Sequence, residues 1–88
     1  MTDVRLSKQA QKILNALQRQ NRQRIINTLK ELQETPFPAH TDIKKIRGIV
    51  DTYRIRIGSY RVIYYIDWEE NAIYVMKIDK RSRAYRSV

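Results

Sequence analysis

The chain has 88 residues, the length of one small domain, and we expect residues 1–88 to form a single one. Eighteen lysines and arginines stand against nine acidic residues, and the resulting net charge of +9 favours an anionic partner such as nucleic acid. The absence of cysteine excludes disulfides and thiolate metal sites. The N-terminus has no apolar signal segment and the longest apolar run is Val62 to Ile66, so we expect a soluble cytoplasmic protein with no membrane partner.

The first 34 residues predict a short strand followed by a helical hairpin. Val4 and Leu6 fit a strand, and Ser7 is a suitable helix N-cap. Two stretches with helical spacing of apolar residues follow, made of Ala10, Ile13, Leu14 and Leu17, then of Ile25, Ile26, Leu29 and Leu32. We expect a break within RQNRQ, residues 19–23, with Asn21 capping a second helix that ends before Thr35. Each helix has one apolar side, which predicts an antiparallel pair that covers a sheet.

The segment TPFPAHTD, residues 35–42, predicts a connector because proline does not continue a helix. A basic loop with Lys44, Lys45 and Arg47 follows. Three strands are expected next, at residues 52–57, 60–66 and near 73–79. For the third strand, keeping Lys77 out of the core predicts that Tyr74, Met76 and Ile78 point inward, and that Lys77, Asp79 and Arg81 share the other face.

The hairpin around Gly58 and Ser59 has a predicted register. A two-residue turn at this pair sets Arg56 opposite Arg61. One face then carries Tyr53, Ile55, Ile57, Tyr60, Val62 and Tyr64, and the other carries Arg54, Arg56 and Arg61. Directly opposed like charges cost about 0.2–1 kcal/mol, so this face needs acidic neighbours, such as Asp79 beside Arg61, or a bound anion. The predicted class is α+β, with the N-terminal helical hairpin packed on one face of a small antiparallel sheet.

The chain offers few groups for catalysis. The single histidine, His40, is expected to face solvent in its loop, and Asp67, Glu69 and Glu70 fall in a polar turn. No pair of residues has metal-ligand spacing, so neither a metal nor a cofactor is expected. Arginine clusters bind phosphate, and tyrosines stack on unpaired bases. The plain alternatives are a solvated strand surface for Arg54 and Arg56 and a frayed end for the basic tail.

Four segments occur in a particular order: K-K-I-R-G, Y-R-I-R-I-G, Y-R-V-I-Y and K-R-x-x-x-Y. In this order and spacing the chain resembles, over nearly its whole length, the RelE-type toxins of toxin–antitoxin systems. The resemblance implies the RelE fold and a ribosome-dependent mRNA endonuclease that needs no metal. Such toxins act in the ribosomal A site, where a ribose 2′-OH attacks the adjacent phosphate.

The resemblance also implies roles for single residues. Arg61 matches the arginine that holds the scissile phosphate, Arg81 the one that assists the leaving oxygen, and Tyr85 the tyrosine that stacks on a base. Arg54 and Arg56 stand where well-studied members carry lysines, and they join the catalytic set by charge and geometry. The expected RNA-binding residues are Lys44, Lys45, Arg47, Lys80 and Arg83.

The expected partners are a cognate RelB-like antitoxin, the ribosome and mRNA, and a heterotetramer with the antitoxin is one assembly that the resemblance allows. Two alternatives remain open: a ParE-like toxin that inhibits DNA gyrase, and a noncatalytic nucleic-acid-binding module. The presence of Arg61, Arg81 and Tyr85 favours the nuclease, because a pure gyrase binder does not need them. Arginine in place of lysine at positions 54 and 56 keeps the noncatalytic module open.

Overall fold

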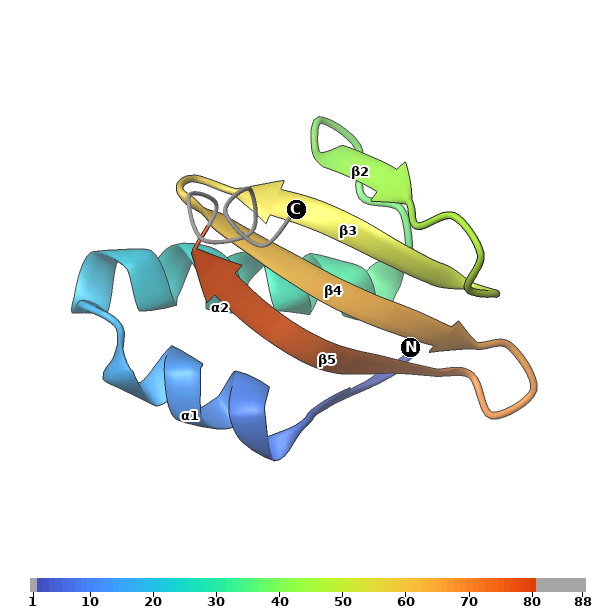
Figure 1. Cartoon of the computed structure of the whole chain (residues 1–88), viewed down its shortest axis with the longest axis horizontal. Coiled ribbons are helices and arrows are strands. Elements are labelled where there is room, and N and C mark those ends of the chain that lie inside the picture. Colours follow the sequence, from blue (N-terminus) through green and yellow to red (C-terminus); the bar gives the residue numbers. More distant parts are fainter. Residues whose placement is uncertain (1, 81–88) are drawn as a thin grey trace.

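A computed structural model describes residues 2–80 as two helices and five strands (Figure 1). In chain order these are β1 (Asp3–Leu6), α1 (Lys8–Ala16), α2 (Arg19–Glu34), β2 (Asp42–Lys45), β3 (Thr52–Ile57), β4 (Tyr60–Asp67) and β5 (Ala72–Lys80). The first strand and the three later ones lie where the sequence predicts them, to within one residue at each end of the later three. Strand β2 was not predicted, because its four residues fall in the segments read as connector and basic loop.

The strands form one sheet in the order β1-β5-β4-β3-β2. The pairs β3–β4 and β4–β5 are antiparallel, as expected, and the unpredicted β2 is antiparallel to β3. Strand β1 instead pairs with β5 in parallel, with Val4 opposite Ile73. The helices and the other three strands intervene between β1 and β5 in the sequence, so no tight turn forces these two to run antiparallel. The α+β class is confirmed, with this parallel edge as an addition.

The two helices meet at a sharper break than the sequence predicts. Ser7 caps α1 as expected, since its Oγ accepts from the Ala10 N–H at 3.1 Å. The prediction that Asn21 caps the second helix is wrong, because α2 already begins at Arg19. Nη1 of Arg22 donates to the carbonyl oxygen of Leu17, the C-cap of α1, at 3.1 Å. This carbonyl thus has a hydrogen-bond donor without a longer connection, and α2 begins two residues later. Neither helix is long and apolar enough to cross a membrane.

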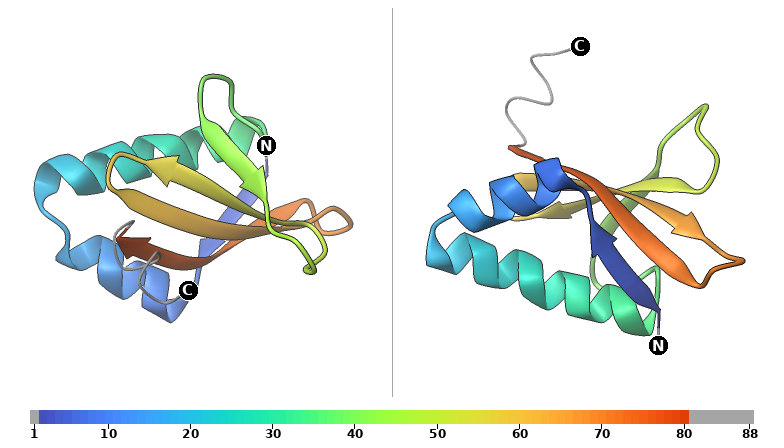
Figure 2. Two further views of the ribbon diagram at one scale, coloured as in Figure 1. Left: turned by 45° about the horizontal axis from the view of Figure 1, so that its top comes forward. Right: turned by 90° about the horizontal axis from the view of Figure 1, so that it is seen from below.

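Both helices contribute to one hydrophobic core on one face of the sheet, and α2 runs beneath the strands (Figure 2). The core contains, from the sheet, Ile55, Ile57, Val62, Tyr64, Ile66, Ile73, Val75 and Ile78. Tyr53 and Tyr60 are partly buried and pack against it, so the predicted apolar face of the hairpin is confirmed. We call the opposite side the open face. By strand register it carries Asp3, Arg5, Asp42, Lys44, Thr52, Arg54, Arg56, Arg61, Ile63, Tyr65, Asp67, Ala72, Tyr74, Lys77 and Asp79.

Strand β5 has a bulge that changes which of its side chains face the core. Ile63 pairs with Lys77 but Tyr64 pairs with Val75, so Met76 has no partner on β4. Inward-facing Ile78 is as predicted, whereas Tyr74 and Met76 were assigned to the wrong side, and Met76 is 49% exposed. The bulge is held from outside the strand, because Ser7 Oγ donates to the Met76 carbonyl oxygen at 2.8 Å.

The hydroxyl of Tyr64 predicts a measurable alkaline instability. Tyr64 is fully buried and donates to the Pro36 carbonyl oxygen at 2.8 Å. Burial, with a smaller contribution from Tyr53, raises the pKa of Tyr64 above its ordinary value near 10. Above about pH 10 the unfolded chain loses this proton while the folded chain keeps it, so the unfolding free energy falls by up to about 1.4 kcal/mol per pH unit.

In urea unfolding at pH 8, Tyr64→Phe is expected to be less stable than the wild type by about 1 kcal/mol, because one hydrogen bond is lost. At pH 11 the gap should close or reverse, since the variant has no proton to lose at this position. A difference in unfolding free energy of the same size at both pH values would contradict the raised pKa of Tyr64.

Candidate nucleic-acid interface

The β3–β4 hairpin sets three arginines on the open face in the predicted register. Gly58 has a φ of +59°, which glycine adopts readily, and the turn aligns Arg56 directly with Arg61. Arg54 lies two residues back along β3 and pairs with Ile63. Side chains alternate along a strand, so all three guanidinium groups project away from the helices.

Arg54 is a buried cation, with only 6% of its surface exposed. This burial excludes the plain alternative in which Arg54 belongs to a solvated strand surface. Its Nη2 lies 3.4 Å from Oδ1 of Asp42, and the second oxygen of the same carboxylate lies 3.5 Å from Nη1 of Arg56. One aspartate on β2 therefore bridges two arginines on β3.

The charge on Arg54 is only partly satisfied by this bridge. Its Nη1 is buried and has no hydrogen-bond partner among residues 2–80. A buried guanidinium needs partners for its donors, because an unmet charged donor is costly. An anion on the open face, such as an RNA phosphate, would supply the acceptor that Nη1 lacks.

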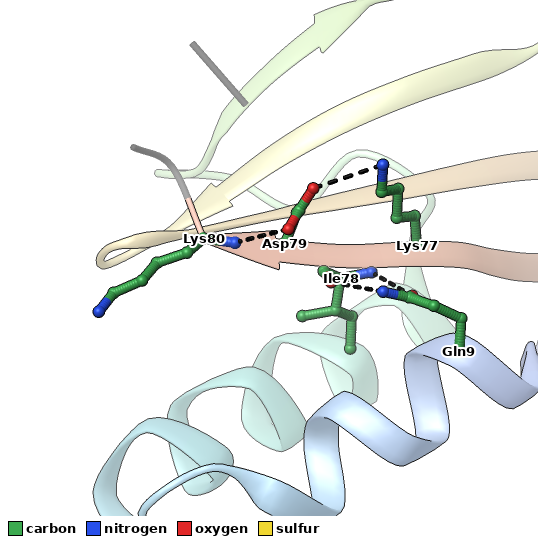
Figure 3. Close-up of polar contacts among 5 residues, drawn as sticks. All are labelled: Gln9, Lys77, Ile78, Asp79 and Lys80. Atoms are coloured by element: carbon green, nitrogen blue, oxygen red, sulfur yellow. Dashed lines mark hydrogen bonds and ion pairs between the residues drawn. The ribbon is translucent and has the colours of Figure 1, made fainter. Parts of the chain in front are cut away.

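Arg61 lies between a cation and an anion, because its cross-strand neighbours are Arg56 on β3 and Asp79 on β5. The predicted pairing of Arg61 with Asp79 is thus confirmed as a register, although the carboxylate makes its ion pair with Lys77 at 3.4 Å (Figure 3). Carboxylates on both flanking strands offset the Arg56–Arg61 repulsion. Arg54, Arg56 and Arg61 therefore stand against two aspartates, Asp42 and Asp79, which leaves this end of the open face positive.

A glutamine of α1 fixes the end of β5. Gln9 Nε2 donates to the Ile78 carbonyl oxygen and Gln9 Oε1 accepts from the Ile78 N–H, both at 3.2 Å. Figure 3 shows Gln9 hydrogen-bonded to the backbone of β5 from the helix side, while Lys77 and Asp79 project on the other side. The backbone of the strand is thereby held in place where it carries Asp79 beside Arg61.

The expected RNA-binding residues do not all lie together. Lys44 shares the open face with Arg54, its cross-strand partner. Lys45 pairs with Tyr53 and so lies on the helix side of β2. Arg47 follows β2 at the end of the sheet away from the Gly58 turn. Lys80 pairs with Tyr60 beside that turn, also on the helix side.

Three predicted site residues, Arg81, Arg83 and Tyr85, lie outside the described residues, and their roles remain predictions. Within residues 2–80 no group of three or more His, Cys, Asp or Glu side chains could hold a metal ion. His40 is exposed, as predicted, with a φ of +63°.

Asp42 is the site residue that sequence reasoning missed. The available signal was the alternation of Asp42, Ile43 and Lys44, in which Ile43 packs on the core and its neighbours face away. Four residues after a proline-rich connector are too few to separate a strand from a loop by periodicity.

Comparison with known proteins identifies the class of protein. Residues 4–85 match the family model described as the ParE toxin of the type II toxin–antitoxin system, parDE. A Methanocaldococcus jannaschii protein named as the toxin RelE1 is 33% identical over 86 residues, which cover 97% of this chain and 96% of that protein. The Escherichia coli mRNA interferase toxin RelE is 31% identical over 65 residues, which cover 72% of this chain and 65% of that protein.

The fold gives the same result. The archaeal RelE–RelB complex from Pyrococcus horikoshii superposes with a TM-score of 0.83 at 33% identity, covering 93% of this chain and 97% of the solved one. The chain therefore belongs to the RelE/ParE family of toxins of type II toxin–antitoxin systems. Within that family its fold and its named relatives are of the RelE type, which confirms the resemblance in the sequence.

Proposed function

We propose that this toxin is a ribosome-dependent mRNA endonuclease, which cuts the codon in the A site and so stops translation. The observation that supports it most is the open face, where Arg54, Arg56 and Arg61 lie together. There the buried Nη1 of Arg54 has no hydrogen-bond acceptor among residues 2–80. A relative 31% identical to this chain carries the name mRNA interferase, which supports the same activity.

In the proposed reaction the ribose 2′-oxygen forms a bond to the adjacent phosphorus as the bond from phosphorus to the 5′-oxygen breaks. Negative charge builds on the phosphoryl oxygens, and arginines placed against them lower the barrier. Arg61 holds the scissile phosphate, Arg54 and Arg56 add positive charge, Arg81 assists the leaving 5′-oxygen, and Tyr85 stacks on a base. The reaction uses neither metal ion nor cofactor.

Arginine at positions 54 and 56 limits what these two residues do. A guanidinium stays protonated at neutral pH and does not take the proton from the 2′-OH, whereas a lysine in a basic cluster can. Arg54 and Arg56 therefore act by charge and hydrogen bonding. The proton passes to another group, such as water or a ribosomal residue.

The proposal includes a protein partner, a RelB-like antitoxin that covers the open face and so keeps the toxin inactive. Its support is that the P. horikoshii relative was solved as a RelE–RelB complex. The charge of +9 agrees with an acidic partner as well as with RNA. A heterotetramer of two toxins and two antitoxins is the assembly we propose.

The proposed activity is tested by primer extension on ribosomes that are stalled with an empty A site. Wild-type protein is expected to produce new mRNA ends within the A-site codon, and Arg81→Ala is expected to lose them while keeping its circular dichroism spectrum and ribosome binding. Intact mRNA after incubation with wild-type protein would overturn the nuclease proposal.

The family model's description as a ParE toxin supports one alternative, inhibition of DNA gyrase by binding. Gyrase supercoiling with purified protein separates the two functions. Inhibition of supercoiling that survives Arg61→Ala, together with uncut mRNA, would favour the gyrase inhibitor. Unimpaired supercoiling is the result we expect.

A further inference from the structure

A pair of tyrosines lies on the same open face as the arginines, at the other end of the strands. Tyr65 on β4 and Tyr74 on β5 are cross-strand partners, with ring centroids 6.4 Å apart and ring planes at 33°. Both rings are partly exposed and neither belongs to the core packed by the helices. Unlike Tyr53, Tyr60 and Tyr64, these rings therefore have no packing partner in the core.

Arg5 extends this pair from the edge strand. It is the β1 partner of Tyr74, its guanidinium carbon lies 5.7 Å from the centre of the Tyr74 ring, and its Nη1 donates to the Tyr74 hydroxyl at 3.5 Å. Its charge is already offset, because Nε lies 2.6 Å from Oδ2 of Asp3. A guanidinium paired in this way is less suited to phosphate than to stacking, which uses its flat surface.

We propose that Arg5, Tyr65 and Tyr74, which we call the tyrosine platform, bind an unpaired RNA base of the strand whose phosphate lies on the arginines. The inference rests on the proposed function for its choice of RNA. Proteins that bind single strands combine a positive track for the backbone with aromatic rings for the bases. Both parts occur here on one sheet face.

The spacing of the two parts suits a single strand. Arg61 and Tyr65 are four residues apart on β4, about 13 Å at the rise of a strand. That distance spans about four stacked nucleotides, or fewer in an extended strand. Lys77 projects between the two parts, beside Ile63, with its side chain 57% exposed, where it meets the connecting phosphates.

The test compares two ligands of equal charge, a six-nucleotide 2′-O-methyl RNA and the same backbone without bases, by fluorescence anisotropy. The wild type is expected to prefer the intact RNA. Tyr65→Leu and Tyr74→Leu are each expected to weaken intact RNA binding about tenfold and to leave binding of the abasic strand within about twofold. Because both ligands carry the same phosphates, the difference isolates the bases.

Two variants serve as controls. Tyr65→Phe keeps the ring and is expected to bind both ligands like the wild type. Trp68→Leu removes an aromatic ring that is 57% exposed in the β4–β5 turn, outside the open face, and is also expected to have no effect. Urea unfolding measures the stability of each variant, so a loss of binding that comes only from a less stable sheet can be recognised.

Equal losses for both ligands, no loss for either, or no measurable binding by the wild type would overturn the platform. Cleavage on stalled ribosomes is measured separately with the same proteins. A base-selective loss in Tyr65→Leu with uncut mRNA in the wild type would mean that the platform stands and the nuclease proposal fails. Normal cleavage without a base-selective loss would mean the reverse.

Discussion

Arg61→Ala is expected to slow cleavage of ribosome-bound mRNA by about 100- to 1000-fold, the loss typical of removing one donor to a charged transition state. The same substitution is not expected to destabilise the fold. Arg61 is only partly buried and stands directly opposite Arg56, so its removal relieves a like-charge contact. The removal also takes a cation away from Asp79 on the other side, so we expect the unfolding free energy to change by less than about 1 kcal/mol. Single-turnover cleavage and urea unfolding measure the two quantities.

Two further variants separate geometry from charge. Arg61→Lys keeps the positive charge but loses the two parallel donors of the guanidinium, so its rate should fall between those of the wild type and Arg61→Ala. Lys77→Ala removes one charge from the same face, and we expect a loss of only a few-fold. Equal losses in Lys77→Ala and Arg61→Ala would show that net charge alone matters and would remove the phosphate-binding role of Arg61.

The hairpin that carries the arginines is predictable because its register is local. A two-residue turn at Gly58 and Ser59 leaves one alignment of β3 with β4, and this fixes Arg56 opposite Arg61 without any knowledge of the rest of the chain. The apolar face follows from the same alternation. The sequence therefore contains the centre of the site in a single stretch of 14 residues, 53–66.

The features that were missed depend on side-chain contacts that the periodicity of the sequence does not show. The bulge at Met76 is held by Ser7, which lies 69 positions away in the sequence. The early start of α2 depends on Arg22 reaching the carbonyl of Leu17. The burial of Arg54 needs β2, whose four residues give almost no periodic signal. Local patterns thus predict which residues face the site, whereas their burial and pairing are set by tertiary structure.

Asp42→Asn is expected to destabilise the protein by about 1–3 kcal/mol, because Arg54 would keep its buried charge without a carboxylate. The side chain of Asp42 is 57% exposed, so the loss should stay below that of a fully buried pair. Asp3→Asn is the matched control, since its ion pair with Arg5 is exposed on both sides and should contribute less than about 1 kcal/mol.

An added anion should then replace the lost carboxylate. If the buried donors of Arg54 form a phosphate site, pyrophosphate binds the folded state of Asp42→Asn more tightly than that of the wild type, because no carboxylate competes for Arg54 and Arg56. A ligand that binds only the folded state stabilises it by RT ln(1 + [L]/Kd), so the tighter site gains more at each ligand concentration. Thermal unfolding with increasing pyrophosphate should therefore raise the melting temperature of Asp42→Asn more steeply than that of Asp3→Asn. Parallel curves would mean that Asp42 and the anion do not share a site, and the phosphate would then have to bind elsewhere on the face.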